Sequence, residues 1–192
     1  MRVPVYRMVG KRLFDIASSA AALVVLSPVM ILTAMAIRAE DGGPALFRQV
    51  RVGAAGRRFT VLKYRSMPVG APNLPSAHGV ALAVTRVGRF IRRTNIDELP
   101  QLLNIVRGDM SVVGPRPAIP AQADLLAMRD ANGASALRPG LTGLAQVQSY
   151  DGMPEAEKAE WDGRYSQRIT LIGDLTIVLK TFGYLARRPP VY

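Results

Sequence analysis

The sequence predicts an α/β fold, mostly helical with a small antiparallel sheet, that is joined to a membrane by its N-terminal part. Three observations predict it: an uncharged apolar stretch of 22 residues from Ile16 to Ile37, a hairpin pattern over residues 46–65, and helical patterns over most of the remaining chain. At 192 residues, the chain has the length of a single domain with a substantial core. We therefore expect one unit rather than two independent domains.

The apolar stretch is long enough for a membrane helix, because its 22 residues would extend roughly 33 Å as an α-helix. Two features argue against a straight span. Ser27 and Pro28 lie in its middle, where proline removes a backbone hydrogen bond and bends a helix. Both flanks are basic, so a straight span would carry one of them across the bilayer, against the positive-inside tendency. A helix that enters, breaks at Ser27-Pro28 and leaves on the same face keeps both flanks cytoplasmic.

The same residues leave two alternatives open, a kinked straight span and a buried core helix. At the break, the Ser27 hydroxyl is placed to satisfy a carbonyl that Pro28 frees. Asp15 lies just inside the apolar boundary, where an unpaired charge is costly. We expect Lys11 or Arg12, one turn earlier, to pair with it.

The chain after the apolar stretch predicts a short β-hairpin followed by helices. Leu46–Val52 and Phe59–Arg65 alternate as strands do, and the glycine-containing turn Gly53–Gly56 joins them. Residues 66–84 form a loop rich in proline, glycine and alanine. Helices are expected at 97–107, 120–131, 154–167 and 169–186. Residues 138–146 are rich in turn formers and end in a short extended stretch.

Composition restricts the chemistry. The chain carries 25 Lys and Arg against 14 Asp and Glu, a net charge of +11, so we expect an acidic partner such as phosphate, nucleic acid or anionic lipid. The absence of cysteine excludes thiol catalysis, disulfides and thiolate metal sites. The single histidine, His78, excludes sites with two imidazoles, and we expect it to be solvated. Aromatic residues are only 6% of the chain and no nucleic-acid-binding motif is present, so a nucleic-acid partner is not expected.

Between Gly42 and Gly108 only two residues are acidic, and they are adjacent: Asp97 and Glu98. Pro100 places them at a helix N-terminus, where the backbone N–H groups favour negative charge. The pair is open to an ordinary interpretation as a helix cap and a first-turn acid. Its surroundings favour a functional site, because eleven basic residues share this part of the chain. They are Arg48, Arg51, Arg57, Arg58, Lys63, Arg65, Arg86, Arg89, Arg92, Arg93 and Arg107.

A carboxylate is ionised at neutral pH and needs no base to act as a nucleophile. Its attack on a phosphoanhydride would form an acyl phosphate, and because both reactants are anions, Arg, Lys and a divalent cation must neutralise them. Neighbouring helical residues point about 100° apart. The pair is therefore better suited to divide nucleophilic attack and metal binding than to flank a sugar as the two carboxyls of a glycosidase do.

The runs TNIDELPQLLN (Thr94–Asn104) and GDMSVVGPRP (Gly108–Pro117) resemble the bacterial sugar transferases, the monotopic phosphoglycosyl transferases. Four further segments agree in order: KRLFD (11–15), DGGPALFRQ (41–49), KYRSM (63–67) and RPGLTGLAQ (138–146). The resemblance extends from Lys11 to about Thr181. It implies a monotopic α/β protein with a re-entrant helix broken at Ser27-Pro28 and with amphipathic helices at the membrane interface.

The resemblance also implies the reaction. Members of the family transfer a sugar 1-phosphate from a UDP-sugar to polyprenol (undecaprenyl) phosphate, release UMP, and form a covalent phosphosugar intermediate that starts a glycan or exopolysaccharide. By this resemblance Asp97 is the nucleophile and Glu98 supports or orients a Mg²⁺ site. Both are candidate metal ligands, and which of them binds the metal directly stays open. The residues expected around the phosphates are Lys63, Arg65, Arg86, Arg116, Arg138 and Gln146.

In this interpretation residues 1–40 form the N-terminal segment with the re-entrant helix, and residues 41–192 form the cytoplasmic catalytic domain, together one functional unit. The expected location is the cytoplasmic face of the bacterial inner membrane, in contact with lipid. The identity of the sugar, the length of the polyprenol and the presence of a homodimer stay open. The alternative function is a membrane-tethered basic scaffold that binds anionic lipid without catalysis.

Overall fold

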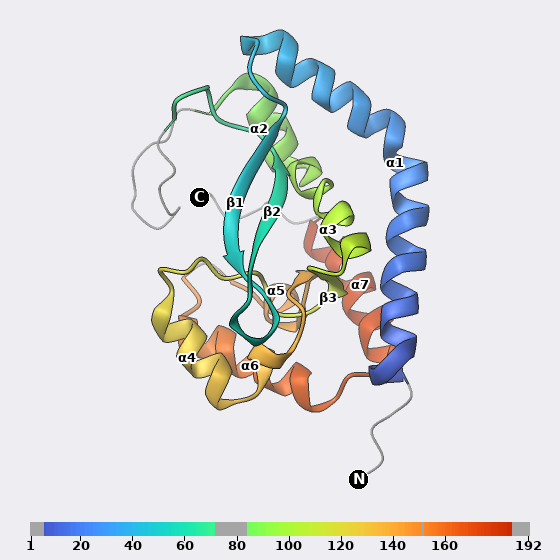
Figure 1. The fold of residues 1–192 in the computed structure, drawn as a ribbon, viewed down its shortest axis with the longest axis vertical. Helices are drawn as coiled ribbons and strands as arrows, with labels where there is room; N and C mark the ends of the chain where they lie inside the picture. The colour runs from blue at the N-terminus through green and yellow to red at the C-terminus, as the bar shows by residue number, and fades with distance from the viewer. Residues whose placement is uncertain (1–5, 72–83, 151, 186–192) are drawn as a thin grey trace.

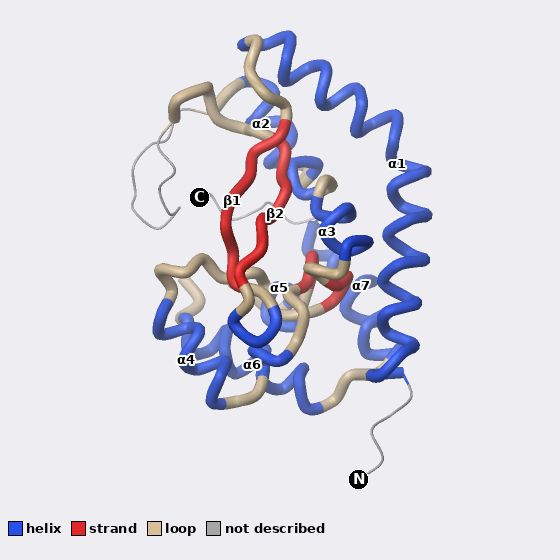
Figure 2. The backbone as a smooth tube through the Cα atoms, viewed as in Figure 1, coloured by secondary structure: helices blue, strands red, loops and turns tan. Residues whose placement is uncertain are grey.

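The structure is a computed structural model that describes residues 6–71, 84–150 and 152–185. One long helix runs along one side of the molecule, a β-hairpin lies at its centre, and shorter helices pack around the hairpin (Figure 1; Figure 2). The expectation for His78 and most of the loop expected at 66–84 lie outside the described residues. The observed fold is mostly helical with small sheets, as predicted.

Helix α1 (Lys11–Asp41) follows a short π-helical turn, Tyr6–Gly10, and ends where Gly42 adopts a left-handed conformation with φ of 71°. Pro28 lies inside it, and the helix changes direction partway along its length (Figure 1). The Ser27 hydroxyl donates to the Val24 carbonyl at 2.8 Å. Val24 is four residues before Pro28, so its carbonyl is the one that lacks a backbone donor, and this part of the prediction is confirmed.

The outer surface of α1 is apolar and exposed. Val24 and Val25 are 75% and 74% exposed, and only 11% of its most apolar 18 residues are buried. The alternative of a buried core helix is therefore wrong. By length and composition α1 is able to cross a membrane, and it is the one such helix among the described residues.

The predicted hairpin is confirmed. Strand β1 (Leu46–Val52) pairs antiparallel with β2 (Arg58–Tyr64), with Leu46 opposite Tyr64 and Val52 opposite Arg58. A short 3₁₀ turn, Ala54–Gly56, closes it. The structure adds a second pair that the sequence analysis did not predict: β3 (Ser111–Val113) runs parallel to β4 (Gly140–Thr142). The expectation of a single antiparallel sheet was wrong because three-residue strands are too short to show an alternating pattern.

Glycines allow the close approach of these two segments. A Cβ atom at Gly140 would collide with the Gly114 backbone, and one at Gly114 would collide with the Arg138 carbonyl. The Gly140 N–H donates to the Pro115 carbonyl at 2.8 Å. The loop after β3 is therefore fixed against the segment that enters β4.

The other helices are α2 (Arg86–Arg93), α3 (Gln101–Arg107), α4 (Ala123–Ala131), α5 (Leu144–Val147), α6 (Glu155–Gln167) and α7 (Leu171–Leu185), with a 3₁₀ turn at Ala134–Ala136. The helices expected at 120–131, 154–167 and 169–186 are confirmed within three residues at each end. Two short helices, α2 and α5, were not predicted.

Helix α2 forms because its N-terminus is capped from two sides. The Thr85 hydroxyl accepts from Gly88 N at 2.9 Å. The Glu40 carboxylate, at the end of α1, accepts from the backbone N–H groups of Arg86 and Val87 at 2.6 and 3.1 Å. The Glu40 contact comes from a distant part of the chain, so no pattern within residues 86–93 reveals it.

Helix α3 docks on the free edge of β2 through one buried side chain, Asn104. Its Oδ1 accepts from Leu62 N at 3.0 Å, and its Nδ2 donates to the Thr60 carbonyl at 2.8 Å. The amide thus takes the place of a neighbouring strand. Apolar side chains of β2 and α3 surround it and form the central core with a residue of the following loop; they are Val61, Leu102, Ile105 and Met110.

Asn104→Ala is expected to lower the free energy of unfolding by about 3 kcal/mol, because it leaves the buried Leu62 N–H without its acceptor and the partly buried Thr60 carbonyl without this donor. Denaturant unfolding in detergent micelles measures this change. Gln148→Ala is the control, because Gln148 is exposed, and it should change stability by less than about 0.5 kcal/mol. Equal stability of the two variants would contradict the docking role.

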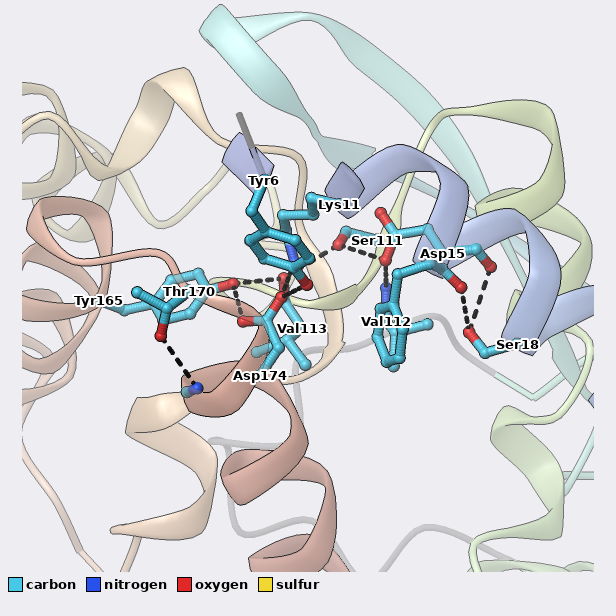
Figure 3. A network of polar contacts seen from close by, with 12 residues as sticks. Tyr6, Lys11, Asp15, Ser18, Ser111, Val112, Val113, Tyr165, Thr170 and Asp174 are labelled. Carbon is cyan, nitrogen blue, oxygen red and sulfur yellow. Dashed lines mark hydrogen bonds and ion pairs between the residues drawn. The ribbon is translucent and has the colours of Figure 1, made fainter. Parts of the chain in front are cut away.

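A polar network ties the start of α1 to α6 and α7 (Figure 3). Asp174 is fully buried and accepts hydrogen bonds from Tyr6 Oη at 2.6 Å, Lys11 Nζ at 2.7 Å and Tyr165 Oη at 2.7 Å. Burial and the Asp174 charge raise the pKa of Tyr165, so its hydroxyl keeps its proton and stays a donor. Asp15 accepts from Ser111 Oγ at 3.0 Å and from the backbone N–H that follows it.

The predicted pairing of Asp15 with Lys11 or Arg12 was therefore wrong. Lys11 binds Asp174, and Arg12 donates to the carbonyls of Ile105 and Val106 at 2.7 and 2.9 Å. Those carbonyls lie in the last turn of α3, where a cation is favoured by the helix dipole. Asp15 is instead buried in the body of the protein, where the Ser111 hydroxyl and the Val112 N–H donate to its carboxylate.

Candidate active site

The acid pair lies in a 3₁₀ turn, Ile96–Glu98, between α2 and α3. Asn95 precedes it in the left-handed conformation, with φ of 54°, a geometry that asparagine tolerates better than most residues. Pro100 is the N-cap of α3. The pair therefore lies just before the N-terminus of α3. The sequence had predicted a helix that begins at Asp97, with the pair in its first turn.

Glu98 is held by two cations that come from separate parts of the fold. Lys63 Nζ, from β2, and Arg116 Nη2, from the loop after β3, both bind Glu98 Oε1, at 2.8 and 2.9 Å. Burial acts to raise the pKa of Glu98, but the charges of Arg116 and Lys63 outweigh it and lower the pKa to about 2. Glu98 is therefore ionised and fixed in place.

Asp97 differs from its neighbour. Burial, and then the Glu98 charge, raise the pKa of Asp97 to about 6, against the opposing charges of Lys63, Arg92 and Arg116. Within the described part of the chain, no hydrogen bond or ion pair holds its carboxylate. At neutral pH Asp97 is thus an ionised and comparatively basic carboxylate that is available to react.

Two further arginines belong to this site. Arg51, on β1, donates to Gln49 Oε1 at 2.9 Å and to the Pro117 carbonyl at 3.1 Å. Burial, and then the Arg116 charge, lower its pKa to about 10. Arg92, on α2, donates to Ser66 Oγ at 2.7 Å and acts electrostatically on Asp97. A shallow depression beside the acid pair is lined by Arg51, Val61, Lys63, Gln101, Arg116 and Pro117.

Neither Arg51 nor Arg92 was among the predicted phosphate ligands. The register of the predicted hairpin could have found Arg51. It lies opposite Phe59, and residues 59, 61 and 63 of one strand share a face, so Arg51 and Lys63 lie on the same face of the hairpin. Arg92 lies in a helix that the sequence analysis did not predict, so no comparable signal placed it.

The structure brings two of the predicted cations, Lys63 and Arg116, to the acid pair. Arg65 is buried elsewhere, in a bidentate ion pair with Asp41, and also donates to the carbonyls of Pro44 and Met67. These four hydrogen bonds use every nitrogen of its guanidinium group. Arg65 thus joins the end of α1 to the end of β2.

The remaining three predicted residues have their hydrogen bonds away from the pair. Arg86 is exposed at the start of α2. Arg138 Nε donates to the Gly108 carbonyl at 3.0 Å, and its side chain is on the surface. Gln146 Nε2 donates to the Leu141 carbonyl at 3.1 Å, while its Oε1 is buried without a hydrogen-bond partner.

A cavity of about 260 Å³ lies between the hairpin turn and α4. Arg58, Leu126, Arg129 and Asp130 contribute to its walls, and Arg116 lines both this cavity and the depression beside the acid pair. Arg116, which binds Glu98, therefore borders both spaces. A phosphate held there would have room for attached groups.

The structure combines a long exposed apolar helix with an acid pair set among lysine and arginine. The sequence profile described as bacterial sugar transferase matches residues 6–188. The chain belongs to the bacterial sugar transferase family, and the resemblance noted from its motifs is confirmed.

Proteins with similar sequences are named as transferases of this kind or as exopolysaccharide production proteins. The UDP-glucose:undecaprenyl-phosphate glucose-1-phosphate transferase of Caulobacter vibrioides is 44% identical over 180 residues, which cover 89% of this chain and 67% of the relative. The exopolysaccharide production protein PSS of Rhizobium leguminosarum is 40% identical over 183 residues, which cover 90% of this chain and 90% of the relative. The UDP-galactose-lipid carrier transferase of Erwinia amylovora is 35% identical over 95% of this chain, which spans only 41% of that relative.

Proposed function

We propose that this chain transfers a sugar 1-phosphate from a UDP-sugar to polyprenol phosphate, releases UMP, and thereby starts an exopolysaccharide or another glycan. The observation that carries the proposal is the asymmetry of the acid pair: Glu98 is held by Lys63 and Arg116, whereas Asp97 is ionised and unheld. The names of the relatives support the substrates, because they include UDP-glucose, UDP-galactose and undecaprenyl phosphate.

In the proposed reaction, a carboxylate oxygen of Asp97 attacks the β-phosphorus of the UDP-sugar. A bond forms between that oxygen and phosphorus, the bond to the bridging oxygen breaks, and UMP leaves with the electron pair. A phosphate oxygen of the polyprenol phosphate then attacks the same phosphorus and releases Asp97. Lys63 and Arg116 lower the cost of bringing anions together, and Arg51 and Arg92 add positive charge around them.

Asp97 and Glu98 also fit a Mg²⁺ ion. Protein-bound Mg²⁺ commonly takes one or two carboxylates together with substrate phosphates and water. Asp97 and Glu98 offer the two carboxylates of such a set. The described residues contain no group of three acidic, histidine or cysteine side chains that would form a complete cage. When bound, Mg²⁺ would supply charge neutralisation for the diphosphate. Asp97 and Glu98 are the residues of this chain that would hold the ion.

We further propose that α1 is a re-entrant helix with both ends on the cytoplasmic side. The bend at Pro28 and the basic residues at both ends support this arrangement. It would place the acid pair on the same side as the UDP-sugar and near the headgroup level, where the phosphate of the lipid acceptor lies. Such an arrangement confines the search for the acceptor to the membrane plane.

Cysteine labelling tests this topology, because the chain has no native cysteine. Val9→Cys and Ala39→Cys introduce single thiols at exposed positions before and near the end of α1. Both are expected to react with an impermeant maleimide in inside-out vesicles and neither in spheroplasts, since both ends face the cytoplasm. Reaction of the two positions from opposite sides would show a span and would contradict the re-entrant arrangement.

The activity itself is tested by UMP release from purified chain supplied with undecaprenyl phosphate, Mg²⁺ and, in separate reactions, UDP-glucose or UDP-galactose. We expect release together with a lipid-linked sugar phosphate, and loss of both when EDTA removes the metal. Absence of UMP with a panel of UDP-sugars would overturn the proposal. Binding to anionic vesicles in that case would favour the scaffold function instead.

A further inference from the structure

The loop that carries Arg116 is held through its carbonyl groups. Prolines flank Arg116 on both sides and have no N–H to donate. Three successive carbonyls accept hydrogen bonds: Pro115 from Gly140 N at 2.8 Å, Arg116 from Arg129 Nη1 at 3.0 Å, and Pro117 from Arg51 Nη1 at 3.1 Å. Of these donors, Arg129 is the one that binds the Arg116 peptide itself.

Arg129, on α4, is buried against Asp162 on α6. Their exposed fractions are 6% and 1%, and Arg129 Nε and Nη2 both donate to Asp162 Oδ2, at 2.9 and 2.6 Å. Apolar contacts between α4 and α6 already hold these helices together, through Leu125 and Ala159. Because burying an ion pair is costly, the pair is a poor device for helix packing alone. Its third nitrogen, Nη1, reaches out of the interface to the loop.

We propose that Arg129, oriented by Asp162, is a positioning residue that fixes the Arg116 loop so that the Arg116 side chain meets Glu98 and the substrate phosphates. The Arg116 side chain is half exposed, at 51%, so its direction depends on where its backbone is held. This role rests on the proposed function for its catalytic consequence. The positioning of the loop can be measured without any activity.

The test variant is Arg129→Met combined with Asp162→Leu, which removes both buried charges together. Replacing a buried ion pair by apolar side chains commonly preserves stability, so the variant is expected to fold. Hydrogen–deuterium exchange at the amides of Gly114, Arg116 and Ala118 should rise at least about fivefold in it. The matched control is Asn132→Ala, which removes a hydrogen bond to the Ala159 carbonyl in the same α4–α6 interface and should leave exchange of the loop unchanged.

Kinetics supply the second measurement. The double substitution should lower kcat/KM for the UDP-sugar by about 10- to 100-fold, and adding Arg116→Gln to it should cost little beyond Arg116→Gln alone, because both act through one side chain. If the double substitution acted only by destabilising the α4–α6 interface, its loss of kcat/KM and that of Arg116→Gln would multiply. We expect such multiplication for Asn132→Ala combined with Arg116→Gln. Unchanged loop exchange, or multiplying losses for the Arg129 set, would overturn the inference. Absence of UMP release by the unmodified chain would overturn the proposed function and leave the exchange result to decide the positioning role.

Discussion

Asp97→Asn is expected to lower UMP release by at least about a thousandfold, because an amide has no anionic oxygen with which to attack phosphorus. The measurement is UMP release with UDP-sugar, undecaprenyl phosphate and Mg²⁺ under the conditions in which the unmodified chain turns over. Glu98→Gln offers a comparison at the adjacent position. It should retain more activity in this reaction, since Glu98 is held by Lys63 and Arg116 and does not attack.

We expect the Asp97→Asn variant to stay folded, because the raised pKa of Asp97 means that its ionised form costs stability. The pKa is about 6 in the fold against an ordinary 3.8, so the folded state binds the proton more tightly than the unfolded state does. Stability is therefore lost as the pH rises from about 4 to 6, when Asp97 ionises in its buried position beside Glu98. The asparagine variant lacks this cost and should melt no lower than the unmodified chain at pH 7.5. Unchanged turnover in a folded variant would contradict the nucleophile assignment.

Asp174→Ala is expected to lower the free energy of unfolding by about 3–5 kcal/mol, because it leaves the Lys11 cation without its buried partner. It also deprives the hydroxyls of Tyr6 and Tyr165 of their shared acceptor. Denaturant unfolding in detergent micelles measures the change. The loss should be among the largest for a single substitution outside the apolar core.

The control for Asp174 is an ion pair of the same type on the surface. Glu160 and Arg164 lie one turn apart on α6, at 2.6 Å, with side chains 60% and 54% exposed. Glu160→Ala should cost less than about 0.5 kcal/mol, because solvent screens exposed pairs. Similar losses at the two positions would mean that the buried network does not hold the start of α1.

Local patterns predicted the parts of the fold that depend on neighbouring residues. The alternation and the glycine turn gave the hairpin, and the spacing of Ser27 and Pro28 gave the hydroxyl contact with the freed carbonyl. The parallel pair of β3 and β4 was missed because its partners are far apart in sequence and each is three residues long. Helix α2 was missed because Glu40, from the end of α1, supplies part of its cap.

The same division applies to the candidate site. Asp97 and Glu98 stood out by composition, since no other acids lie within that basic part of the chain. Their cations could not be ranked in this way. Lys63 and Arg65 are only two residues apart, yet Lys63 forms an ion pair with Glu98 and Arg65 forms one with Asp41. The choice depends on which acid the folded backbone places nearby, and a list of charges does not contain that information.

The two ends of α1 each hold one of the helices that flank the acid pair. Arg12 donates hydrogen bonds to two carbonyls in the last turn of α3. Glu40 accepts hydrogen bonds from the first N–H groups of α2. The apolar helix that is proposed to enter the lipid therefore also supports the residues proposed to react. Removing α1 to make a water-soluble fragment would therefore take away one support from each of α2 and α3, together with the proposed membrane anchor.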